Sequence, residues 1–90
     1  MKLTYFYLKT CPHCRRADEM IAQLLEEEPA FRGVEVQKIE ESEHPEIADR
    51  YDYWYVPCFF LGEEKLFEGV PSREKIRGVF EKALAAKENS

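Results

Sequence analysis

Two cysteines separated by two residues, in Cys11-Pro12-His13-Cys14, are the part of this chain best suited to chemistry. Thiols at this spacing can close into a small disulfide ring. The apolar run at residues 3–8 predicts a strand before them, and Pro12 suits the first turn of a helix because proline lacks an amide N–H and has a preset φ. The sulfur of Cys11 would then lie at a helix N-terminus, where partial positive charge favours the thiolate that attacks disulfides.

The two thiols are expected to differ in role. Cys11 is predicted to be the exposed nucleophile, and Cys14, one turn into the helix, to be the buried resolving thiol with the higher pKa, which attacks the mixed disulfide and releases the product. The alternative is a buried, unreactive pair. His13, when protonated, would favour the Cys11 thiolate and make the disulfide more oxidising, unless it is simply a solvated side chain.

Lys9 and Cys58 have two interpretations each. Lys9 and Thr10 precede the pair as candidate substrate-binding residues, and Lys9 would steer a substrate carboxylate or favour the thiolate, or else be a solvated lysine at a strand end. Cys58 follows Val56-Pro57. We expect Cys58 to be a small buried hydrophobe, with a third redox thiol or a metal ligand as the alternative.

Four aromatic residues form a dense patch just before Val56. Some of them must belong to the core, and an exposed Trp54 or Tyr55 would suit the docking of a protein or peptide disulfide. The four residues are Tyr51, Tyr53, Trp54 and Tyr55.

Length and composition narrow the class of protein. Ninety residues predict one domain, residues 1–90. A net charge of -5 argues against a nucleic-acid binder, which usually has a basic face. The first apolar run is too short for a secretory or membrane-spanning segment, so a cytoplasmic, non-membrane protein is expected. Three cysteines do not form a secreted disulfide framework, which leaves a catalytic or metal-binding role for the pair.

Hydrophobic periodicity predicts the elements that position these residues. Apolar residues recur at helical spacing over 12–28 and again after Ser72, which can cap the last helix, and a short helix opens at Pro45. Strands are predicted at 3–8, 34–39, 58–61 and 65–68, the last two joined by a hairpin turn, with residues 40–43 an acidic loop. A helix-length crossover makes the first two strands parallel, so the fold class is α/β, a four-stranded mixed sheet with helices on both faces.

This arrangement resembles the thioredoxin fold superfamily, and most closely its small glutaredoxin-like branch. The features shared with it are a strand-CxxC-helix start, the order of the strands, Val56-Pro57 at the opening of the third strand, and Gly69 before the last helix. The resemblance implies a cis Val56-Pro57 bond beside the dithiol, and a Val56 backbone able to pair with an extended substrate. Tyr5 stands about where thioredoxins keep a buried aspartate.

The resemblance implies a thiol–disulfide oxidoreductase without an organic cofactor, taking part in electron transport and cell redox homeostasis. Cys11 would attack a substrate disulfide and Cys14 would release the product. Protein disulfides are the expected substrates, because the Gly-Gly-Asp pattern of glutathione-binding glutaredoxins is incomplete around Gly69; glutathione mixed disulfides are the second choice. A recycling reductase and a monomeric state are expected. The alternatives are a metal-binding thiol protein and a non-catalytic thioredoxin-like interaction module.

Overall fold

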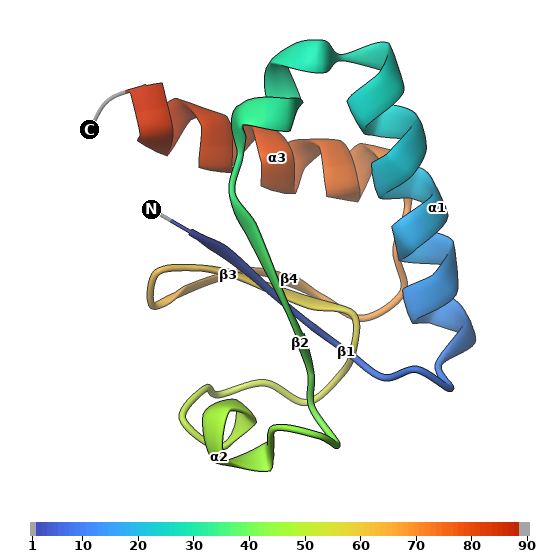
Figure 1. The fold of residues 1–90 in the computed structure, drawn as a ribbon, viewed down its shortest axis with the longest axis vertical. Helices are drawn as coiled ribbons and strands as arrows, with labels where there is room; N and C mark the ends of the chain where they lie inside the picture. Colours follow the sequence, from blue (N-terminus) through green and yellow to red (C-terminus); the bar gives the residue numbers. More distant parts are fainter. Residues whose placement is uncertain (1, 89–90) are drawn as a thin grey trace.

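The structure, a computed structural model, describes residues 2–88 and contains four strands and three α-helices (Figure 1). In chain order they are β1 (Leu3–Tyr7), α1 (Pro12–Glu27), the 3-10 helix η1 (Pro29–Gly33), β2 (Val36–Glu40), α2 (Pro45–Ala48), β3 (Cys58–Leu61), β4 (Glu64–Glu68) and α3 (Arg73–Glu88).

The four strands form one mixed sheet in the order β2-β1-β3-β4. β1 runs parallel to β2 and antiparallel to β3, and β3 and β4 form an antiparallel hairpin. The predicted sheet is therefore confirmed. β1 and β3 are central and almost wholly apolar, whereas β2 is an edge strand that is exposed at Gln37 and Lys38 and buried at Ile39 and Glu40.

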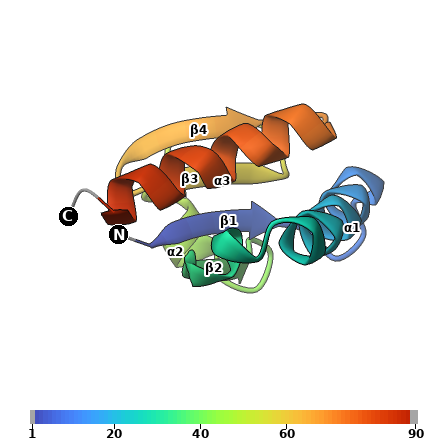
Figure 2. The same ribbon diagram turned by 90° about the horizontal axis from the view of Figure 1, so that it is seen from above.

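Successive side chains of β1 enter two different cores. Tyr5 faces the larger core, which α1, η1 and α3 cover, and Phe6 faces the smaller core, which α2 and the loop after it cover. Figures 1 and 2 show α1 and α3 on one side of the sheet and α2 apart from them. Helices thus cover both faces, as the sequence predicts, and the period-2 geometry of the strand divides its residues between them.

The second strand begins and ends later than the sequence predicts. Pro29 ends α1, but the chain then forms η1, which buries Phe31 and Val34 against α1 and α3. β2 consequently covers Val36–Glu40 instead of 34–39. The prediction that Glu40 belongs to an acidic loop is wrong, since Glu40 is the last residue of β2 and is only 5% exposed.

The last helix starts where its cap predicts. The Ser72 Oγ accepts a hydrogen bond from the backbone N–H of Lys75 at 3.2 Å, which satisfies one of the free amides of the first turn of α3. None of the helices within residues 2–88 has the length and apolar character needed to span a bilayer.

Candidate active site

Cys11 lies at the junction of β1 and α1. It is the N-cap residue of α1, with extended backbone (φ −87°, ψ 115°), and its carbonyl accepts the first helical hydrogen bonds, from Cys14 at 3.1 Å and Arg15 at 3.2 Å. Pro12 occupies the first helical position. The side chain of Cys11 is partly exposed. A sulfur in this position meets the positive end of the helix dipole and can still reach a substrate.

Cys14 is buried within the first turn of α1 and only 1% exposed. Burial is the main reason that its pKa is raised, and a hydrogen bond from its thiol to Cys11, together with the charge of that sulfur, adds to the rise. A hydrogen bond from the backbone of Leu8 acts in the opposite direction. Cys14 is therefore protonated near neutral pH, and it must lose a proton before it can act as a nucleophile.

A segment 45 residues further along the chain completes the site. The Cys11 Sγ lies 3.9 Å from the carbonyl oxygen of Val56, within reach of a thiol hydrogen bond. The Val56-Pro57 bond is cis, as the resemblance implied, and Pro57 is fully buried. The backbone N–H of Gly69 donates to the carbonyl of Pro57 at 3.1 Å, with Gly69 at a φ of +105° that favours glycine. The fold thus brings Cys11, Val56, Pro57 and Gly69 together.

A polar group not found from the sequence lies beneath the dithiol. The hydroxyl of Tyr5 donates to the Asp18 carboxylate at 2.9 Å and lies 3.2 Å from the carbonyl oxygen of Cys14. Lys38, on β2, lies 3.4 Å from the same carboxylate. Burial and the charge of Asp18 raise the pKa of Tyr5, so its hydroxyl stays protonated as a donor. The signal in the sequence was the i, i+4 spacing of Cys14 and Asp18, which puts them on one face of a helix.

The remaining predicted site residues are exposed. Thr10 lies in the turn before Cys11, and His13 lies in the first turn of α1 with its side chain in solvent. Lys9 is not a free cation, because its ammonium pairs with the carboxylate of Glu43 at 2.6 Å. That hydrogen bond raises the pKa of Lys9, while the paired charge reduces what it could offer to an anion. The roles predicted for His13, Thr10 and Lys9 stay predictions.

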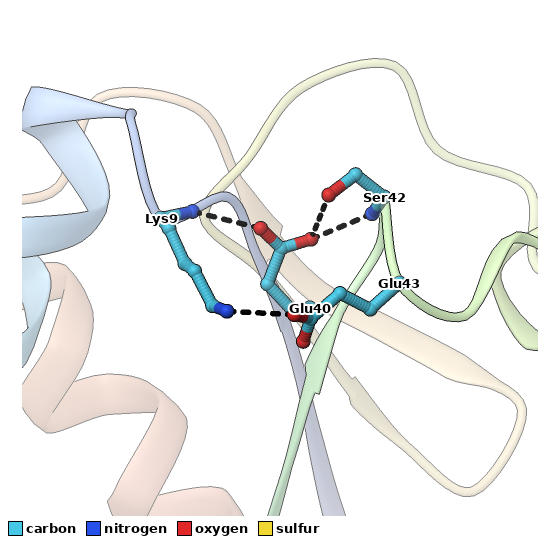
Figure 3. Close-up of polar contacts among 4 residues, drawn as sticks. All are labelled: Lys9, Glu40, Ser42 and Glu43. Carbon is cyan, nitrogen blue, oxygen red and sulfur yellow. Dashed lines mark hydrogen bonds and ion pairs between the residues drawn. The ribbon is translucent and has the colours of Figure 1, made fainter.

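Glu40 is the second feature missed from the sequence (Figure 3). One oxygen of its carboxylate accepts a hydrogen bond from the backbone N–H of Lys9 at 3.1 Å, and the other accepts two from Ser42, through N and Oγ, both at 2.6 Å. These hydrogen bonds lower the pKa of Glu40 to about 2, with the Ser42 hydroxyl as the largest contribution. A buried anion therefore contacts the turn that leads to Cys11.

Cys58 lies apart from the dithiol, on the other face of the sheet. It packs fully buried among Phe6, Ile39 and Phe60, and burial raises its pKa to about 12. This is the environment of a small hydrophobe. Within residues 2–88, no group of three or more His, Cys, Asp or Glu side chains is arranged to hold a metal ion.

The aromatic patch divides between core and surface. Tyr51 and Tyr53 pack on Phe6 in the smaller core. Trp54 and Tyr55 are 82% and 67% exposed, and their backbone N–H groups both donate to the carboxylate of Glu68, at 2.7 and 3.0 Å. Two exposed aromatic side chains thus precede Val56, held by hydrogen bonds to their backbone.

A family model, a sequence relative and solved structures all match this chain to the same fold. The thioredoxin domain family matches residues 2–81. A thioredoxin of Methanocaldococcus jannaschii is 30% identical over 84 residues, which is 93% of this chain and 96% of that protein. The structure of thioredoxin 1 from Thermosipho africanus superposes with a TM-score of 0.68 at 18% identity, covering 98% of this chain and 99% of the other. A malarial protein superposes with a TM-score of 0.66 at 15% identity, covering 91% and 94%.

Proposed function

Because this chain belongs to the thioredoxin domain family and carries a Cys11-Cys14 pair, which makes it a thiol oxidoreductase in the broad sense, we propose that it catalyses thiol–disulfide exchange on protein disulfides. The observation that carries the proposal is the asymmetry of the two thiols. One is partly exposed at a helix N-terminus beside Val56, and the other is buried one turn later.

In the first step the Cys11 thiolate attacks one sulfur of a substrate disulfide. A bond forms between the Cys11 Sγ and that sulfur, the substrate S–S bond breaks, and the other substrate sulfur leaves as a thiolate that takes a proton from solvent. The helix dipole supports the attacking thiolate. A substrate can approach because Cys11 is partly exposed.

In the second step the Cys14 thiolate attacks the Cys11 sulfur, the bond between Cys11 and the substrate breaks, and the second substrate sulfur leaves as a thiolate that takes a proton from solvent. The two protein thiols are oxidised to a disulfide and the substrate disulfide is reduced by two electrons. Cys14 must first lose its proton, and the charge of Asp18 is among the causes of its raised pKa. We propose that Asp18, which lies four residues after Cys14 on the same face of α1 and is held by Tyr5 and Lys38, accepts that proton.

An extended polypeptide fits the surface beside Cys11. Among residues 2–88 nothing pairs with the backbone N–H of Val56, so a substrate strand can hydrogen-bond there while its disulfide meets Cys11. Three large apolar side chains near this position are exposed: Trp54, Tyr55 and Val70. Apolar contact of this kind favours a protein disulfide over glutathione. A monomeric cytoplasmic protein that a separate reductase, or glutathione, returns to the dithiol is consistent with this proposal.

The proposal is tested by trapping the first intermediate. In Cys14→Ser the second step is blocked, so the reduced variant should hold a disulfide-bonded peptide as a stable one-to-one adduct through Cys11, visible by intact mass and located by peptide mapping. Cys11→Ser is the matched control and should form no adduct, although Cys14 and Cys58 remain. Failure of Cys14→Ser to form an adduct, or an adduct at Cys58, would contradict the mechanism.

A further inference from the structure

Glu40 is the one charged residue that is buried in the described part of the chain, at 5% exposure. A buried carboxylate is strongly unfavourable unless it is hydrogen-bonded or paired with a cation. Its partners are the backbone N–H of Lys9 and the N–H and hydroxyl of Ser42. None of these groups is a cation, since the Lys9 ammonium binds Glu43 instead. Hydrogen bonds from these donors therefore stabilise the buried carboxylate, and the donors in turn need it as their acceptor.

One of these donors belongs to the turn that carries Cys11. The backbone N–H of Cys11 donates to the carbonyl of Leu8 at 3.1 Å, which closes a four-residue turn with Lys9 and Thr10 in the middle. The N–H of the second residue in such a turn has no acceptor inside the turn. Glu40 supplies that acceptor from β2, so its carboxylate joins the edge strand to the turn (Figure 3).

The backbone and side chain of Glu40, at the β2 end of this contact, are themselves held by hydrogen bonds. The backbone of Glu40 accepts hydrogen bonds from Glu43 and His44, both at 3.1 Å, and the neighbouring Glu41 N–H donates to Tyr7 at the end of β1 at 3.0 Å. Ser42 holds the second carboxylate oxygen. The carboxylate therefore has a defined position relative to the sheet. Its hydrogen bond to the Lys9 N–H holds the turn in a fixed position relative to the sheet as well.

We propose that Glu40 is a positioning residue for the redox centre: its buried carboxylate holds the turn of residues 8–11 so that the Cys11 sulfur stays at the N-terminus of α1 beside Val56. This inference rests on the proposed thiol–disulfide exchange at Cys11. Glu40 acts through the Lys9 backbone and touches neither sulfur nor substrate. If the turn moves, the Cys11 sulfur leaves the position where the helix dipole supports its thiolate.

Two variants at position 40 distinguish the effect of the carboxylate's hydrogen-bond geometry from the effect of its negative charge. Glu40→Gln keeps the size of the side chain, but an amide offers only one acceptor oxygen, so either Lys9 or Ser42 loses its partner. Glu40→Asp keeps the charge but is one methylene shorter. Glu46→Gln is the matched control, because it makes the same chemical change on a nearby exposed carboxylate whose partner is His44 and not a residue of the turn.

The readout is the rate at which iodoacetamide alkylates Cys11 at neutral pH, measured by peptide mass mapping on the folded, reduced protein. We expect Glu40→Gln and Glu40→Asp to slow alkylation by about threefold to tenfold, the range that one lost hydrogen bond gives. Glu46→Gln should stay within about twofold of the wild type, as expected for an exposed pair. Removing a negative charge without moving the turn would speed alkylation, so slowing in Glu40→Gln is specific to position.

A second readout tests the same link through the redox equilibrium. The equilibrium constant of the Cys11-Cys14 disulfide with glutathione should differ from that of the wild type in both position-40 variants but not in Glu46→Gln. A folded Glu40→Gln protein alkylated at or above the wild-type rate would overturn the proposal; if that variant does not fold, Glu40→Asp decides by the same criterion. Alkylation needs no disulfide exchange, so a wild-type protein that exchanged no disulfide would refute the proposed function alone.

Discussion

At the scale of single residues, the fold gives the three cysteines three different environments. Cys11 is partly exposed at a helix start, Cys14 is buried one turn later, and Cys58 is buried on the opposite face of the sheet. Exposure and local charge decide whether a thiol reacts, and residue type alone does not. Only Cys11 has the surroundings of a nucleophile.

Replacing Cys58 tests its assignment as a core residue. Cys58→Ala should lower the free energy of unfolding by about 1 kcal/mol, because it removes about one buried methylene equivalent. Cys58→Ser should lower it by a further ~1–3 kcal/mol, because its hydroxyl would be buried among apolar side chains. Urea unfolding measures both. Trapping of substrate by Cys14→Ser should be unaffected when Cys58→Ala is added, and a lost adduct in that folded double variant would show that Cys58 takes part.

Tyr5→Phe tests the polar group beneath the dithiol. The ring would stay stacked on Phe59, at 4.6 Å between centroids, but the bond to Asp18 would be lost. We expect a loss of about 0.5–1.5 kcal/mol in stability and slower release of product from the mixed disulfide, because Asp18 is no longer held. Stopped-flow turnover measures that step. Tyr7→Phe is the control, since within residues 2–88 the Tyr7 hydroxyl makes no hydrogen bond; equal slowing in both would contradict the role of Asp18.

At the scale of elements, five segments assemble the site: the ends of β1 and β2, the start of α1, the loop before β3 and the loop after β4. Gly69 follows β4 and donates its N–H to the carbonyl of Pro57. Glu68, beside it, accepts from the backbone of Trp54 and Tyr55. The end of the hairpin therefore holds the segment that faces Cys11.

Two glycine substitutions should have opposite effects. At Gly69 an added Cβ would meet no atom within 4 Å, but the φ of +105° is strained for any other residue, so Gly69→Ala should lower stability by about 1–3 kcal/mol. Gly78 lies inside α3 and also has open space, so Gly78→Ala should raise stability by about 0.5–1 kcal/mol through helix propensity. Urea midpoints measure both, and a Gly69→Ala protein as stable as the wild type would contradict the backbone argument.

At the scale of the whole molecule, the chain is acidic, and some of its carboxylates also hold loops of the fold in place. The chain carries a net charge of -5, yet two of its carboxylates hold the loops around the site in place. Glu40 fixes the turn before Cys11, and Glu68 fixes the segment before Val56. Acidic residues therefore contribute to the stability of the fold here, as well as to solubility.

Stability should fall on acidification over a defined range. The pKa values of Glu40 and Glu68 are both lowered to about 2, the latter mainly by its bond with Lys65, against about 4.3 in an unfolded chain. The unfolded state therefore binds more protons between these values, so this stabilisation is complete above about pH 5 and is lost as the pH falls toward 2. Melting temperatures at pH 7, 4 and 2.5 measure the loss.

Glu68→Gln is the matched test of that acid dependence. It should melt lower than the wild type at pH 7 but lose less on acidification, because its side chain does not titrate. A wild-type melting temperature that stays constant from pH 7 to pH 2.5 would contradict the role assigned to the two carboxylates.

The sequence by itself determined the number and order of the strands, the two long helices and the mixed sheet, but not the bounds of β2. The features that it did determine depend on the local periodicity of apolar residues, on Pro12, and on the crossover rule for parallel strands. It also placed Cys11 at a helix start and, through resemblance, a cis Val56-Pro57 bond, because both are marked by short motifs.

Only the tertiary structure decided which side chains meet. Residue 40 was predicted to belong to an acidic loop, and its burial depends on a turn 31 residues earlier that supplies a hydrogen-bond donor. The sequence did not show that Glu43 pairs with the ammonium of Lys9, or that Asp18 accepts a hydrogen bond from the hydroxyl of Tyr5. Hydrogen bonds between distant segments leave no periodic signal in the chain, because the geometry that pairs them exists only after the sheet has formed.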